Sequence, residues 1–306
     1  MSLDSLPIEL LLECVELAVA VHPSPACIVA VNKRYYALAY NLLYAHPHIR
    51  SGRAILLFLR TPPVPPRSLS VTLAGGEVGS GQFRALAELF RRCVSRRDGA
   101  GKLMPTPFEM DELRLCMNIT TRADADDTTL EALKLVNPRK LSWTGPDPPH
   151  HFSVAIVPAA CTNLFARAAR WTQLRSLHLA NIAFPPPQEL FAFPALRALE
   201  ELYIGQATFF PVPALAVLVC TQDMGVLRSV RLVDCYVESI WGGRVRRGLI
   251  ERVAAIWWET DGVDYAKCAR EAGERVRRVR ETVMCEARTE RIEGGDRVAD
   301  GMLILE

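Results

Sequence analysis

The sequence predicts a mixed α/β chain, with a small helical unit at the N-terminus followed by an irregular solenoid of short parallel strands and covering helices. Three observations lead to this class. Residues 6–43 show helical periodicity, a short motif of paired apolar positions recurs after residue 66, and helical patterns separate its copies. Residues 61–66 form a stiff proline-rich junction, so we expect two domains, 1–60 and 61–306.

The composition is that of an ordinary globular chain. The 306 residues include 36 Lys and Arg against 34 Asp and Glu, a formal net charge of +2. This balance gives no sign of a nucleic-acid partner, and no early apolar run is long and uncharged enough to span a membrane. Nine irregularly spaced cysteines, without a C-x-x-C pair or a secretory signal, predict reduced thiols and a cytoplasmic or nuclear location.

The N-terminal unit is predicted to contain two helical runs. Asp4 or Ser5 can cap the first, and Pro7 suits its first turn. An apolar stripe follows on one side of this helix, made of Leu6, Leu10, Cys14 and Leu17. The prolines at 23 and 25 end it, and a second helical run extends from Ala26 to about Leu43.

The repeated motif is L-x-x-L-x-L-x-x-N, with substitutions. Clear copies begin at Met110, Leu174, Leu199 and Leu227, and weaker ones at Pro66 and Pro138. The central apolar residue falls at positions 69, 113, 141, 177, 202 and 230, and the runs 82–97, 129–136 and 159–171 between copies are helical in pattern. This arrangement resembles an irregular leucine-rich repeat, in which each strand joins a parallel sheet and each helix covers its convex side.

The residue between the paired apolar positions of each copy is expected on the concave face, because side chains alternate along a strand. These residues should form one row across successive strands and are the predicted target-binding residues: Ser70, Arg114, Ser142, His178, Tyr203 and Arg231. Arg and Tyr are common anchors in protein interfaces, which favours a moderately acidic or polar partner.

The periodicity fades after Val237. Val253, Ile256, Trp257 and Trp258 form an apolar patch that could cap the open end of the stack. A charged helix with apolar residues at spacings of three and four begins near Asp264, and we expect it to be a terminal capping helix. The tail after Gly294 is predicted to be a loose end with a short final strand.

The first 50 residues resemble an F-box of the fungal type. Residues 6–11 read L-P-I-E-L-L, residues 29–39 read V-A-V-N-K-R-Y-Y-A-L-A, and residues 42–49 read L-L-Y-A-H-P-H-I. The resemblance implies a substrate-receptor subunit of an SCF-type ubiquitin ligase in the ubiquitin-like conjugation pathway, binding a Skp-type adaptor. The implied adaptor contacts are Leu6, Pro7, Leu10, Leu11, Ile28, Val31 and Tyr35. The family's usual Trp is Tyr35 or Tyr36 here, and the link between the first helices is proline-rich.

No catalytic, metal or cofactor signature accompanies these features. The glycine-rich residues 73–81 fit no phosphate-binding motif, and His150-His151 has no cysteine partner at a zinc spacing. We therefore expect no enzyme, no cofactor and no metal. Two alternatives stay open: a leucine-rich-repeat interaction scaffold without a ligase link, whose N-terminal helices are only a cap, and an enzyme whose motif is unfamiliar.

Overall fold

The structure is a computed structural model of the chain. It describes residues 6–22, 24–60, 65–73, 80–94, 107–119, 129–147, 153–221, 226–256, 265–293 and 296–306. Asp4, Ser5, the glycines of residues 74–79, His150-His151 and Trp257-Trp258 lie outside these ranges, so the expectations placed on them are not addressed by the structure.

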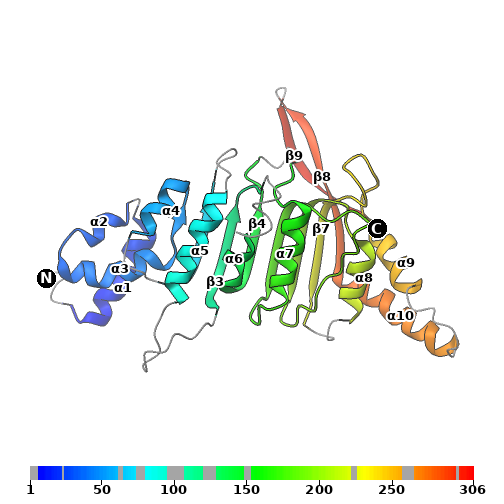
Figure 1. Cartoon of the computed structure of the whole chain (residues 1–306), viewed down its shortest axis with the longest axis horizontal. Helices are drawn as coiled ribbons and strands as arrows, with labels where there is room; N and C mark the ends of the chain where they lie inside the picture. The colour runs from blue at the N-terminus through cyan, green and yellow to red at the C-terminus, as the bar shows by residue number, and fades with distance from the viewer. Residues whose placement is uncertain are drawn as a thin grey trace.

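Helices and strands alternate along most of the chain (Figure 1). The helices are α1 (Ile8–Val21), α2 (Ala26–Val29), α3 (Lys33–Ala45), α4 (Gly52–Phe58), α5 (Ser80–Val94), α6 (Thr129–Lys134), α7 (Pro158–Ala168), α8 (Val212–Thr221), α9 (Arg247–Ile256) and α10 (Tyr265–Thr282). The strands are β1 (His48–Ile49), β2 (Ser68–Thr72), β3 (Phe108–Cys116), β4 (Val136–Thr144), β5 (Ser176–Ala183), β6 (Glu201–Thr208), β7 (Ser229–Cys235), β8 (Val283–Glu293) and β9 (Asp296–Ile304).

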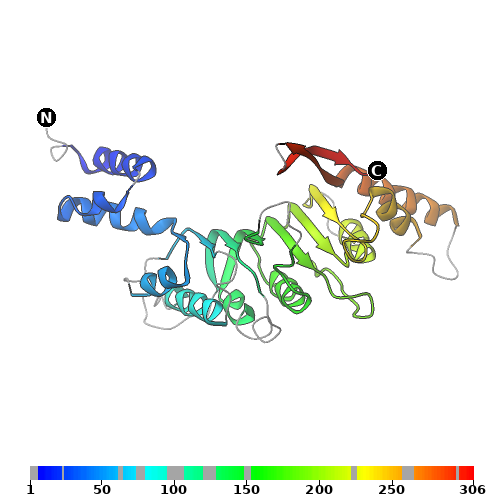
Figure 2. The ribbon, with the colours of Figure 1, turned by 90° about the horizontal axis from the view of Figure 1, so that it is seen from above.

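The described strands form one open, nine-stranded sheet in which spatial order follows chain order from β1 to β9. Strands β1 to β8 are parallel, and β9 returns antiparallel to β8. The helices α4 to α8 lie on one side of the strands, and the opposite side is open (Figure 2). The predicted mixed α/β class is confirmed at this level.

The strand register agrees with the repeat. Leu113 pairs with Leu69 and Leu141, Leu177 pairs with Leu141 and Leu202, and Val230 continues the same line. These side chains are buried beneath the helices, whereas their neighbours along each strand face the open side. The two weaker copies, at Pro66 and Pro138, are also strands, β2 and β4.

The buried apolar residues form two clusters within the described chain. The larger one runs along the helix side of the sheet and includes Phe90, Trp143 and Phe165 among its largest side chains. The smaller one joins α1, α2 and α3 around Leu11 and Val15. Strand β1 and helix α4, which also fall within residues 1–60, contribute Ile49 and Ile55 to the larger cluster.

The predicted second helical run is two helices, because the chain turns between Val29 and Lys33. Asn32 has extended backbone angles, and its Oδ1 accepts hydrogen bonds from the amides of Arg34 at 2.9 Å and Tyr35 at 3.0 Å. An Asn side chain that satisfies the first free amides starts a new helix. The expectation of one continuous helix from Ala26 to Leu43 was wrong.

The prediction for the C-terminal part, a terminal capping helix followed by a loose tail with a short final strand, was wrong in part. Helix α10 lies where expected, but it leads into β8, which pairs parallel with β7 from Val283 to Glu286. The tail is not a loose end with a short strand, since β9 pairs with β8 along most of its length. The sheet therefore extends by two strands beyond the last recognised repeat.

Candidate binding face

The sheet brings the six predicted target-binding residues into one row. Its register places Ser70 beside Arg114, Arg114 beside Ser142, and Ser142 beside His178; Tyr203 and Arg231 follow on β6 and β7. His48 on β1 and Met284 on β8 extend the row at its two ends. The predicted alignment is thus confirmed, and the row lies on the side of the sheet that α4 to α8 leave open.

The centre of the row is an aromatic stack. The His178 and Tyr203 rings are nearly parallel, with centroids 4.0 Å apart and an interplanar angle of 9°. The Arg231 guanidinium carbon lies 5.9 Å from the Tyr203 ring centroid, within cation–π range. Gly205 makes this arrangement possible, because a Cβ there would lie 2.9 Å from a ring carbon of Tyr203. The edge of the Tyr203 ring therefore lies over Gly205, two residues further along β6.

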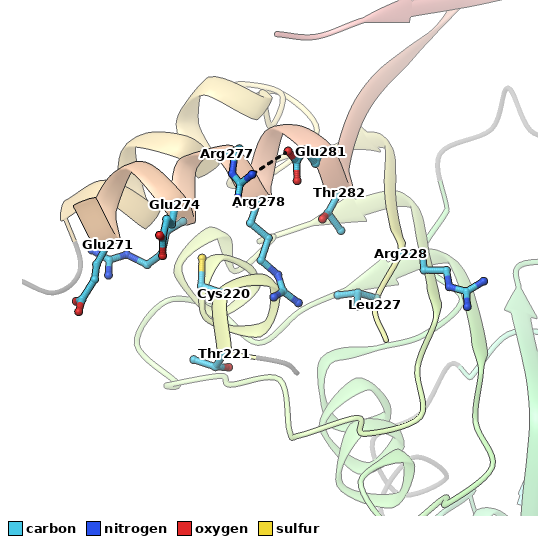
Figure 3. A pocket seen from close by; sticks show the side chains of 11 residues that line it. Cys220, Thr221, Leu227, Arg228, Glu271, Glu274, Arg277, Arg278, Glu281 and Thr282 are labelled. Atoms are coloured by element: carbon cyan, nitrogen blue, oxygen red, sulfur yellow. Dashed lines mark ion pairs between the residues drawn. The ribbon is translucent and has the colours of Figure 1, made fainter. Parts of the chain in front are cut away.

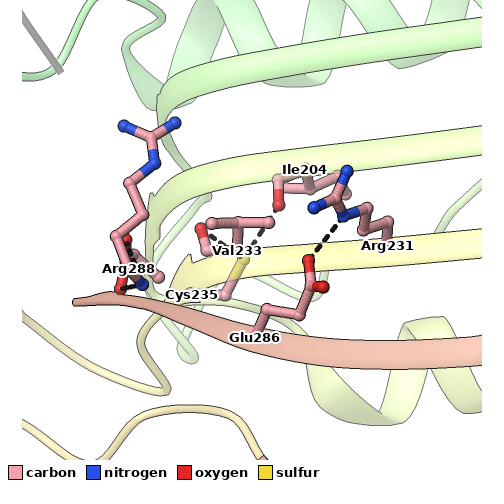
Figure 4. Close-up of polar contacts among 7 residues, drawn as sticks. Ile204, Arg231, Val233, Cys235, Glu286 and Arg288 are labelled. Carbon is pink, nitrogen blue, oxygen red and sulfur yellow. Dashed lines mark hydrogen bonds and ion pairs between the residues drawn. The ribbon is translucent and has the colours of Figure 1, made fainter. Parts of the chain in front are cut away.

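Arginine–glutamate pairs flank the stack. Arg231 on β7 donates from Nε to the carboxylate of Glu286 on β8, whose side chain is only 8% exposed (Figure 4). Arg114 on β3 donates to Glu112 at 2.8 Å. Arg288, also on β8, hydrogen-bonds Tyr203 through its side chain. The stack is thus bordered by cations on both sides, and two of these have a carboxylate partner.

The pKa values report the same environment. Burial lowers the pKa of His178, and the positive charges of Arg114, Arg231 and Arg288 lower it further. Burial also raises the pKa of Tyr203, while the hydrogen bond to Glu286 raises the pKa of Arg231. At neutral pH the row therefore presents a neutral imidazole and a neutral phenol between guanidinium groups.

Three buried polar residues secure the strand ends next to this face. Asn181, Gln206 and Asp234 occupy equivalent positions on β5, β6 and β7, and all three have positive φ, between 47° and 61°. The Asn181 amide donates to Gln206 Oε1 at 2.9 Å, and the Asp234 carboxylate accepts from the amide of Arg288 at 3.3 Å. This left-handed conformation is uncommon outside glycine, and the hydrogen bond to Asp234 holds the β8 backbone that carries Arg288.

Glu286 and Arg288 were missed in the sequence because β8 was not predicted. The signal for this strand is the alternation of Val283, Cys285 and Ala287, all buried, with exposed or polar residues between them. That pattern is the two-residue period of a strand, but its motif lacks leucine and lies 53 positions beyond the previous core residue, Val230.

The predicted apolar stripe on α1 faces outward. Leu10 is 49% exposed, Leu17 is 68% exposed and Cys14 is also exposed, whereas the next stripe, Leu11 and Val15, is buried against α3. Val21 continues the exposed stripe at 80%. One residue of offset turns a side chain by about 100° around a helix, so the two stripes lie on different sides.

The seven predicted adaptor-contact residues divide accordingly. Pro7, Leu10 and Val31 are exposed, and Leu6 and Tyr35 are half-buried against the small helical core. Leu11 and Ile28 are core residues, so we correct their predicted role: they hold the three helices together and do not present a contact surface.

A separate hollow of about 650 Å³ lies on the helix side, between α8, α10 and the start of β7 (Figure 3). Cys220 and Leu227 line its inner part, and Arg278 reaches in from α10. Its rim carries mixed charge, including the ion pair Arg277–Glu281 at 3.9 Å. The hollow includes none of the predicted site residues.

Other chemistry-bearing groups are dispersed over the described residues. No three of their His, Cys, Asp or Glu side chains gather as metal ligands would. None of the helices in these ranges is long and apolar enough to cross a membrane. Two of the basic residues in the range 244–247 pair with acids: Arg244 with Asp234 and Arg247 with Glu251. No protein-family model and no curated protein matches the chain.

Proposed function

We propose that the chain is a substrate-receptor subunit of an SCF-type ubiquitin ligase. In this proposal α1–α3 are an F-box-like unit that binds the Skp-type adaptor. The following α/β part is a leucine-rich-repeat solenoid, and its open face holds the protein to be ubiquitinated. Such a receptor needs no catalytic group, because the transfer of ubiquitin occurs on other subunits. Nine cysteines without a disulfide among the described ones fit a reducing cytoplasmic or nuclear location.

The observation that carries the proposal is the exposed apolar stripe of α1. Leu10, Cys14, Leu17 and Val21 recur at helical spacing on the solvent side, while Leu11 and Val15 already supply the helix with a buried side. Exposed apolar surface on a helix of a soluble protein is typical of an interaction site. The stripe begins within the L-P-I-E-L-L sequence that carries the F-box resemblance.

The separate core of α1–α3 also supports a docking unit over a simple cap. A cap covers the last repeat and shares its core. Here the sheet core at this end is completed by Ile49 of β1 and Ile55 of α4, and the buried cluster of α1–α3 stands apart from it. The aromatic contacts Tyr40–Tyr44 and Tyr44–Phe58 connect the two parts, with ring centroids 4.8 and 5.6 Å apart.

The solenoid part of the proposal is supported by register. The repeat places apolar residues in line under the helices, and the residues between them in line on the open face. A row of side chains with uniform strand spacing suits recognition of an extended segment that crosses the strands.

The test is binding of the full-length chain to a purified Skp-type adaptor, measured by calorimetry. We expect binding by the wild type and its loss in Leu10→Asp and Leu17→Asp, since a charge in an apolar interface is left without a partner. Leu190→Asp is the matched control, because Leu190 is fully exposed on a loop far from α1. A wild-type chain that does not bind an adaptor recognised by a known F-box protein would refute the ligase link and leave an interaction scaffold.

A further inference from the structure

The open face has arginines at two separated points of one row. Arg114 lies on β3 and Arg231 on β7, and Ser142, His178 and Tyr203 occupy the three strands between them. Neighbouring strands are about 4.8 Å apart, so four steps separate the two arginine Cα positions by about 19 Å. The residues between the arginines are uncharged at neutral pH, and the stacked His178 and Tyr203 rings lie at their centre.

The row itself has two cations and no acid, while Glu112 and Glu201, two residues before Arg114 and Tyr203, face the same side. Three arginines, at 114, 231 and 288, act on the His178 ring, and the acids paired with them are Glu112 and Glu286. Glu286 is engaged through Nε of Arg231, and Glu112 through one terminal nitrogen of Arg114. A guanidinium carries five N–H donors, so an arginine held in this way can still present donors to a second carboxylate.

The carboxylate partners also fix the arginine positions. Figure 4 shows Arg231 extending from β7 above Glu286, with Arg288 on the same side of β8. Glu286 is nearly buried, and the Tyr203 ring lies between the His178 ring and the Arg231 guanidinium with its edge over Gly205. Donors and aromatic rings that are already in place before binding lower the entropy lost when a flexible ligand binds.

We propose that the open face recognises an extended acidic peptide segment, with two carboxylates about six residues apart that pair with Arg114 and Arg231. The spacing follows from the geometry, because an extended chain advances about 3.3 Å per residue and covers about 19 Å in six. The peptide between the acids lies over the His178–Tyr203 stack, where it can contact the edges of the two rings. Arg288 adds a donor beside the second carboxylate. This inference rests on the proposed function for its identification of a target protein, although binding of the segment itself does not require the adaptor.

A peptide is favoured over nucleic acid by the charge pattern. A nucleic-acid strand carries a phosphate at every nucleotide and is matched by a continuous row of cations. Here two cationic points are separated by three uncharged residues, and buried or half-buried glutamates lie beside the arginines. A nucleic-acid strand would place phosphates over the uncharged residues between the arginines, where no cation of the row compensates them, whereas two carboxylates at the correct distance meet an arginine at each position.

The experiment measures binding of fluorescent dodecapeptides to the full-length chain by anisotropy. The probe peptide has two Asp residues six positions apart around a central Tyr in a Gly/Ser background. Comparison peptides place the acids two positions apart or replace both by Asn, and a ribonucleotide strand of similar length serves as competitor. We expect the six-residue spacing to bind on the order of tenfold more tightly than either comparison peptide, as expected for a pair of charge-assisted hydrogen bonds.

Variants connect this binding to the row. Arg114→Gln and Arg231→Gln should each weaken the probe on the order of tenfold, with the dependence on spacing lost in either one. Arg170→Gln, an exposed arginine after α7, is the matched control and should bind like the wild type. Thermal unfolding of each variant verifies that the chain is folded. If either substitution unfolds the chain, Gly205→Ala, which displaces Tyr203 without removing a charge, tests the same surface.

Each remaining outcome is decisive. Equal binding of the Asn peptide, indifference to spacing, no binding of the probe at millimolar concentration, or stronger binding of the ribonucleotide would overturn the inference. If the wild-type chain does not bind the adaptor in the calorimetric test but still selects the probe peptide, the proposed ligase function is overturned and the peptide site remains.

Discussion

Gly205→Ala isolates the contribution of the aromatic stack to the open face. The added methyl would lie 2.9 Å from a ring carbon of Tyr203 and 3.0 Å from its hydroxyl oxygen, and a real Cβ does not come closer than 3.0 Å to another heavy atom. Ordinary contact begins near 3.4 Å, so the ring must move by about half an ångström or rotate away. The clash is with the far end of a side chain that borders solvent, and the strand backbone can remain in place.

The expected cost is small and specific. An aromatic pair contributes about 0.5–1.5 kcal/mol beyond the area it buries, and overpacking of an interior costs about 1–3 kcal/mol. Because Tyr203 can turn toward the open side, we expect a loss of about 1 kcal/mol in the free energy of unfolding. In a chain of this size, that lowers the melting temperature by only a few degrees. Binding of the acidic probe peptide should weaken in parallel.

The assay is chemical denaturation of four chains: the wild type, Gly205→Ala, Tyr203→Ala and the double variant. If the methyl acts through the ring, Gly205→Ala should cost almost nothing in the Tyr203→Ala background, and the coupling energy should be about 1 kcal/mol. Gly243→Ala is the matched control, because a Cβ at that position meets no atom within 4 Å. Equal destabilisation in both backgrounds would show that the clash involves the backbone and would refute this account of Gly205.

Three further predictions concern the core, a helix start and a titrating group. Leu177→Ala should lower the free energy of unfolding by about 2–5 kcal/mol, because this side chain is fully buried. Leu190→Ala, on an exposed loop, should change it little, and an equal loss of stability in the two variants would contradict the predicted core. Asn32→Ala should destabilise α3 by about 1 kcal/mol through loss of its cap, detected as a lower denaturation midpoint, and a neutral effect would show that the cap is dispensable. The pKa of His178 is lowered in the folded chain, so the unfolded chain binds the proton more readily and protonation favours unfolding. The contribution of neutral His178 to stability is therefore complete above the ordinary value of 6.5 and is lost as the pH falls below it. The melting-temperature advantage of the wild type over His178→Gln should narrow under acidic conditions, and a difference that does not change with pH would refute the assignment.

The repeat shows how far sequence periodicity reaches. Leu113, Leu177 and Val230 were placed correctly because an apolar residue that recurs within a fixed motif has one way to be buried in a stack of strands. The alternation of side chains along each strand likewise placed Arg114, His178 and Tyr203 on the open face. Their alignment was therefore predictable, but the ring stack, the clearance at Gly205 and the buried carboxylate of Glu286 were not, because these depend on side-chain conformations and on a strand with no recognisable motif.

What the sequence determined by itself is the identity of the strands β2 to β7, their register, and which side chains share a face, since each of these follows from local alternation. Tertiary structure decided two matters that local pattern leaves open. Helix α1 carries an apolar stripe at Leu10 and Leu17 and another at Leu11 and Val15, and only packing against α3 decides which one is buried. At the other end, Val283 and Cys285 become a strand because the unpaired edge of β7 is there to hydrogen-bond them, and this contact is made across more than fifty residues of intervening chain.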